Sequence, residues 1–149
     1  MVVKWLTYPS RQELPLLAES AQATLKDIGI EVDINCTADN NSILEDPTAW
    51  DVYAMANVQA PTGDPEYWFT VFATSDATKN SGKYSSAKLD ELEAQLSKEF
   101  DNDKRAELAV QMQQTILDDN AFVFCSFLKM SMISRSNVTG YESHACDYY

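Results

Sequence analysis

The sequence is poor in the residues that mark several whole classes of protein. Its 149 residues include only four glycines, five prolines and one histidine, which excludes collagen-like and low-complexity chains. No apolar run approaches the roughly 18 residues that a membrane-spanning helix needs. Apolar residues make up 45% and aromatic residues 11% of the chain, as in a folded globular protein, and the length suits one domain.

Positive charge is scarce as well. Eleven Lys and Arg against 23 Asp and Glu give a net charge of −12. Phosphate backbones and anionic membranes repel a domain this acidic, so we exclude nucleic acid as its main partner. The three cysteines, Cys36, Cys125 and Cys146, cannot all pair within one chain, and we expect two buried thiols and one near a tail.

The beginning of the chain carries no recognisable targeting signal. The residues MVVKWLTY lack the long apolar run of a signal peptide and already alternate like a strand. Either the protein is cytosolic, or the sequence is an excerpt whose targeting signal lies upstream.

The first third of the chain predicts a βαβ unit. We expect a strand over 2–8, a helix over 13–28 that ends at Gly29, and an edge strand over 30–36 with one solvated face. Residues 51–56 predict a short, buried third strand. Strands joined through a helix by short links indicate an α/β fold, with a mostly parallel sheet and flanking helices.

The second half predicts mainly helices. One begins at Asp64-Pro65, where Asp caps and Pro occupies the first turn. Amphipathic helices follow over 86–99 and 102–118, the latter capped by Asp101. Residues 121–134 predict one long or two short apolar strands.

No catalytic set assembles from these motifs. The single histidine, His144, lies five residues from the end of the chain, a poor place for a held catalytic group. There is no zinc-ligand spacing and no glycine-rich phosphate loop, and the paired carboxylates occur at predicted helix ends as solvated caps. We therefore expect no catalytic residue, no metal ligand and no cofactor.

The loop over 57–65 is the most informative stretch. It follows a predicted strand at the carboxyl end, where open α/β sheets bind their ligands. The alternative is a plain connection whose aromatic neighbours pack into the core. The candidate ligand-binding residues are Asn57, Val58, Gln59, Ala60, Pro61, Thr62 and Asp64.

Four segments carry a resemblance to a known family. They are LTYPSRQELPLLAESAQATLKDIGIEV, WDVYAMANVQAPTGDPEYWF, KYSSAKLDELEAQLSKEFDNDKRAELAVQMQQTILDDNAFVFCSF and SMISRSNVTGY. In this order and spacing, the chain resembles the C-terminal part of the family 5 extracellular solute-binding proteins. These are the dipeptide, oligopeptide and nickel binding components of ABC importers.

The resemblance implies a fold and a role. Residues 1–141 would be the second, C-terminal lobe of a periplasmic-binding-protein-like fold, with a loosely ordered tail at 142–149. Members of the family close two lobes on a small polar cargo, deliver it to an ABC permease outside the cytoplasm, often as lipoproteins, and do no chemistry. The partners would be a peptide-like or metal-chelate cargo, the N-terminal lobe of the same protein and the permease.

The family's ligand residues carry over only in part. In peptide binders, this loop often holds a Trp and then an Asp that pairs with the peptide's α-amino group. Aligned on Gly63-Asp64-Pro65, these positions fall on Val58 and Pro61, so an ammonium partner would have to come from Asp64 or from the other lobe. The nickel-type pattern is matched at Ala60-Pro61 and Asp64-Pro65, and the pocket histidine of some nickel binders has no counterpart in 74–83.

Two other classes of protein remain alternatives. A small cytosolic flavodoxin-like α/β enzyme would need a phosphate loop after the first strand, where this chain has Tyr8-Pro9-Ser10-Arg11 and no glycine. A stand-alone interaction domain is the third possibility.

Overall fold

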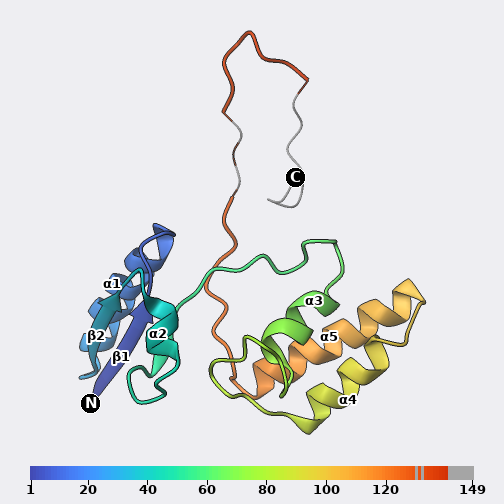
Figure 1. The fold of residues 1–149 in the computed structure, drawn as a ribbon, viewed down its shortest axis with the longest axis horizontal. Helices are drawn as coiled ribbons and strands as arrows, with labels where there is room; N and C mark the ends of the chain where they lie inside the picture. Colours follow the sequence, from blue (N-terminus) through green and yellow to red (C-terminus); the bar gives the residue numbers. More distant parts are fainter. Residues whose placement is uncertain (130, 132, 141–149) are drawn as a thin grey trace. The chain divides into compact units, whose positions relative to one another are not determined.

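The computed structural model describes residues 1–129, 131 and 133–140. The chain forms two compact units, Met1–Asn57 and Val58–Tyr149 (Figure 1). The predicted tail, with His144 and Cys146, lies outside the described residues. In the described part of the chain, no helix has both the length and the apolar character that crossing a membrane requires.

The first unit is a three-stranded parallel sheet with two helices. Strand β1 pairs in parallel with β2 on one side and with β3 on the other, so β2 is an edge strand as predicted. The core of this unit contains Leu6, Leu14, Ala18, Val32 and Ala54. The elements are β1 (Val2–Thr7), α1 (Glu13–Lys26), β2 (Glu31–Cys36), α2 (Asn40–Leu44) and β3 (Val52–Tyr53).

The predicted end of the first helix is confirmed in its hydrogen bonds. Gly29 has a φ of +80°, a left-handed conformation that glycine adopts without a Cβ penalty. The amide of Ile30 reaches back to the carbonyl of Leu25 at 3.0 Å, which satisfies one of the last carbonyls of the helix. The chain therefore turns directly from α1 into β2, as the βαβ prediction requires.

The second unit is helical. It contains α3 (Glu66–Trp68), the π-helical turn η1 (Phe69–Ala73), α4 (Ala87–Leu96) and α5 (Asn102–Asp118). Helices α4 and α5 pack against each other (Figure 1). The side chain of Asp101 accepts hydrogen bonds from two amides at the start of α5, as the cap prediction expected. The core includes Trp68, Phe69, Phe72, Leu89, Leu92, Leu96, Ala109, Met112 and Ile116.

Two predictions are wrong, and a third holds only in part. The third strand pairs with β1, but it spans Val52–Tyr53 in place of 51–56, and both residues are half-buried. The described residues of 121–134 contain no strand; instead, the ring of Phe122 lies 5.3 Å from that of Trp68, and the ring of Phe124 lies 5.5 Å from it. An apolar run becomes a strand only where another strand pairs with its backbone, and no such pairing occurs for this run among the described residues. The expectation of buried thiols also fails: Cys36 and Cys125 are both exposed, the first at the end of an edge strand and the second in this apolar run.

Candidate functional site

The boundary between the two units falls inside the predicted binding loop, between Asn57 and Val58. Asn57 and Thr62 are exposed, whereas Val58, Gln59, Ala60 and Pro61 are half-buried. Within the loop, the amide of Gly63 donates to the carbonyl of Ala60 at 3.0 Å, and Gly63 has a φ of +81°. The loop therefore turns tightly just before the helical segment begins.

The end of the loop is fixed by Asp64. One carboxylate oxygen accepts the amide hydrogen of Glu66 at 2.9 Å, so the aspartate caps the start of α3 as predicted. This bond, followed by hydrogen bonds and charge attraction from Arg105, lowers the pKa of the Asp64 carboxyl. Asp64 is therefore held in its charged form by groups of its own unit.

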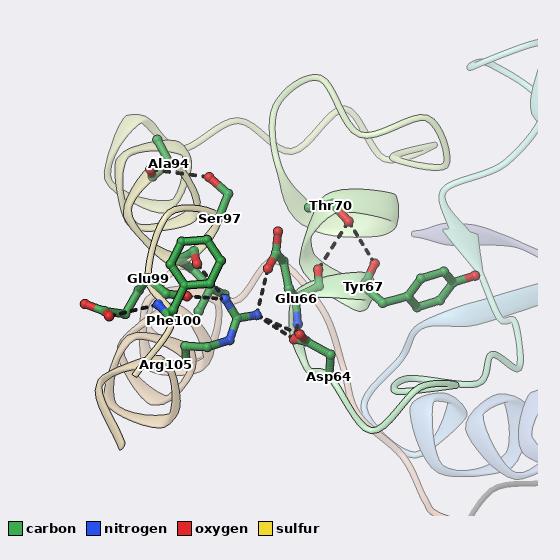
Figure 2. Close-up of polar contacts among 10 residues, drawn as sticks. Asp64, Glu66, Tyr67, Thr70, Ala94, Ser97, Glu99, Phe100 and Arg105 are labelled. Atoms are coloured by element: carbon green, nitrogen blue, oxygen red, sulfur yellow. Dashed lines mark hydrogen bonds and ion pairs between the residues drawn. The ribbon is translucent and has the colours of Figure 1, made fainter. Parts of the chain in front are cut away.

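Arg105, near the start of α5, is the centre of a polar cluster (Figure 2). Its Nη2 donates to both carboxylate oxygens of Asp64, at 2.9 and 2.7 Å, and to a carboxylate oxygen of Glu66 at 2.8 Å. Its Nη1 donates to the carbonyls of Leu96 and Glu99, at 2.8 and 2.9 Å. The guanidinium therefore joins the loop to the chain that follows α4.

An apolar pocket of about 260 Å³ adjoins the same loop. Gln59 and Ala60 contribute to it from the loop, together with the buried rings of Trp68 and Phe69. It is mostly apolar, with the amides of Gln59 and Gln113 as its polar side chains, a composition typical of small-molecule sites. Its remaining lining residues are Pro65, Ile116, Leu117, Phe124 and Phe127.

In the first unit, Tyr8 holds the chain just before the loop. It directly follows β1, and its hydroxyl oxygen accepts the amide hydrogen of Ala56 at 3.0 Å. Nearby, the side-chain amide nitrogen of Asn40 donates to the hydroxyl of Tyr53 at 3.0 Å. The ring centroids of Tyr8 and Tyr53 lie 6.4 Å apart. Polar side chains therefore gather at the carboxyl end of this parallel sheet, where ligands bind in such folds.

Arg105 and Tyr8 are the residues of this region that sequence reasoning missed. Arg105 bonds Asp64 across 41 residues of sequence and Tyr8 bonds Ala56 across 48, and no local pattern connects such distant positions. A signal for Arg105 existed in the resemblance, because Arg105 lies in the third of the four segments that resemble the family. Within the part of the chain that the structure describes, no three His, Cys, Asp or Glu side chains group as metal ligands do.

Comparison with known proteins finds a relative that is a solute-binding protein. The chain is 27% identical to the nickel-binding protein NikA of Staphylococcus aureus over 140 residues, which is 94% of this chain and 28% of that protein. No family model matches the chain.

Solved structures agree. The structure of Staphylococcus aureus NikA in complex with Ni(L-His)2 superposes with a TM-score of 0.74 and 30% identity, covering 77% of this chain and 25% of that one. A nickel ABC transporter protein from Bacillus halodurans gives 0.74 and 30%, covering 80% and 25%. A peptide binding protein, AppA, from Clostridium difficile gives 0.71 and 29%, covering 79% and 25%.

These relatives confirm the predicted resemblance to family 5 solute-binding proteins and the periplasmic-binding-protein-like α/β fold class. They are binding components and not enzymes, which agrees with the expectation that the chain performs no catalysis. The chain spans about a quarter of the length of the relatives that it matches.

Proposed function

We propose that this chain, similar along nearly its whole length to one segment of family 5 solute-binding proteins, is the C-terminal lobe of such a protein. The protein would capture a small polar solute outside the cytoplasm and deliver it to an ABC permease. The observation that carries the proposal is that a nickel-binding protein matches the chain both in sequence and in fold. The relatives suggest two kinds of cargo, a peptide-like molecule and a metal chelate.

The loop over 57–62 would supply this lobe's contacts. Its backbone groups and the side chains of Asn57, Gln59 and Thr62 can form hydrogen bonds with the amide or carboxylate groups that peptides and amino-acid chelates share. Support for this assignment comes from the position of the loop, which follows β3 at the carboxyl end of a parallel sheet. Apolar parts of the cargo could use the neighbouring pocket beside Gln59 and Ala60.

The mechanism would be hinge closure around the cargo. A second lobe, encoded outside this sequence, would cover the cargo from the other side, and the closed form would be the one that the permease recognises. Binding energy would then come from two surfaces. We therefore expect the 149-residue chain alone to bind cargo weakly or not at all.

Native mass spectrometry tests the proposal most directly. The product of the complete gene, purified without unfolding, should carry a small molecule whose mass identifies it. Calorimetry should then give micromolar or tighter binding of that molecule to the complete protein after it has been stripped of cargo. Absence of any bound or bindable solute among peptides and nickel–amino-acid complexes would contradict the proposal, and micromolar binding of a dipeptide to the 149-residue chain would contradict the need for a second lobe.

A further inference from the structure

We propose that Arg105 positions the binding loop and withdraws Asp64 from cargo recognition, so that the loop receives a part of the cargo that carries no positive charge. The second part of this inference, the withdrawal of Asp64 from cargo recognition, rests on the proposed function. The first part, the positioning of the loop, concerns only the second unit and can be tested without any cargo.

The geometry of Arg105 suits a fixed support. Its side chain is only 17% exposed, and its two terminal nitrogens make five hydrogen bonds to four residues. Figure 2 shows the guanidinium lying between Asp64 and Glu66 on one side and the chain near Glu99 on the other. A planar guanidinium held in this way is preorganised, because its donors lie in fixed directions. A flexible lysine ammonium cannot reproduce this arrangement of hydrogen bonds well.

The Asp64 side chain is 44% exposed, so its hydrogen bonds, and not burial, are what limit its access to a ligand. One oxygen accepts from both the Glu66 amide and Arg105, and the other accepts from Arg105. A cargo ammonium or metal ion would have to displace a guanidinium that is already in place. Since Val58 and Pro61 stand where peptide binders often have a Trp and the ammonium-binding Asp, the loop offers no other carboxylate for this purpose.

The charges of the cluster predict what removal of Arg105 would do. One guanidinium faces two carboxylates, Asp64 and Glu66, and the negative charge of Glu66 helps, after burial, to raise the pKa of Glu93. Without Arg105, the carboxylates of Asp64 and Glu66 would lose the cation that pairs with them. The same loop would then attract cations that the native protein leaves unbound.

The first test measures hydrogen exchange in the 149-residue chain carrying Arg105→Gln. We expect amides of the loop, including those of Gly63 and Glu66, to exchange about tenfold faster or more, as the loss of charge-assisted hydrogen bonds implies. Lys104→Gln is the matched control, because it removes the same charge from the adjacent residue, whose 66% exposed side chain has only a 4.0 Å ion pair with Glu99. Its loop exchange should stay within about twofold of the native rate.

The second test measures cargo preference in the complete protein, with alanyl-alanine and its N-acetylated form as probes. Arg105→Gln should bind the free ammonium form better, relative to the acetylated form, than the native protein does. Addition of Asp64→Asn should abolish this gain, and Arg105→Lys should resemble the native protein in preference but exchange faster in the loop. A loss of stability alone would not produce a preference that depends on Asp64.

The outcomes separate the two proposals. Unchanged loop exchange in Arg105→Gln overturns the positioning role whatever the cargo is. Altered exchange with no gain for the ammonium probe overturns the withdrawal of Asp64. If neither native nor variant protein binds any solute, the proposed function fails while the exchange result still stands. Should Arg105→Gln not fold, Asp64→Ala replaces it in the exchange test, because it removes the acceptor oxygens of the same contact.

Discussion

Two neighbouring residues of α5 allow a sharp test of the core of the second unit. Ile116 is 1% exposed and Leu117 is 51% exposed, although both carry four-carbon apolar side chains on the same helix. Ile116→Ala removes buried methyl groups and leaves a cavity, a change that costs about 2–5 kcal/mol. Leu117→Ala loses only about half of a full burial term of roughly 1.5–3 kcal/mol, so we expect a cost near 1 kcal/mol.

Unfolding by urea and by heat measures the difference. Trp68 is the only tryptophan of the second unit, so its fluorescence, in a background carrying Trp5→Phe and Trp50→Phe, reports on this unit alone. For a unit of this size, Ile116→Ala should lower the thermal midpoint by roughly 10 °C or more and Leu117→Ala by a few degrees. Equal losses in the two variants would refute the reasoning, because the structure places only one of these side chains wholly inside the core.

Three further predictions concern polar groups. Asp101→Ala should lower the free energy of unfolding by about 1 kcal/mol in urea titrations, whereas Asp101→Asn, which keeps an acceptor oxygen, should lose little; equal losses would argue against the cap. Asn80 is 7% exposed, donates to the carbonyls of Thr74 and Tyr84 and accepts from the amide of Tyr84, so Asn80→Ala should cost about 1–3 kcal/mol, and Asn80→Asp, which loses the donors, should not restore stability at neutral pH. The folded pKa of Asp64 lies below its unfolded value of about 3.9, so its contribution to stability is fully present above that pH and is lost as pH falls through the folded pKa. Asp64→Asn should therefore remove part of the acid destabilisation below about pH 4, and superimposable acid unfolding curves for native and variant protein would contradict this.

The elements predicted correctly are those whose signals are local. The alternation of β2, the glycine after α1 and the leucines of α4 each report on a few adjacent turns or residues, and each has the expected structure. The run 121–134 has an equally strong apolar pattern but lacks a paired strand in the described chain. Strand formation depends on a neighbour, and a single segment cannot reveal whether that neighbour is present.

The candidate site divides in the same way. The position of the loop followed from the order of strand, loop and helix, and its capping aspartate followed from the Asp64-Pro65 pair. The roles of Arg105 and Tyr8 did not, because each depends on the folded chain bringing together residues that lie more than 40 positions apart. Asp64 illustrates the consequence: from sequence it is a helix cap and a candidate carboxylate for the cargo, and in the structure Arg105 already pairs with it.

The hydrogen bonds that hold the two ends of the loop imply that different residues of the loop should affect stability and cargo binding. Tyr8 holds Ala56 before the loop, within the first unit, and Arg105 holds Asp64 after it, within the second. Between these anchors, the exposed side chains of Asn57 and Thr62 have little burial to lose, so their replacement should leave the folded units intact. Replacement of an anchor instead changes the path of the backbone that those side chains stand on. If the loop binds cargo, substitutions between the anchors should therefore weaken binding without unfolding, and substitutions at the anchors should alter both.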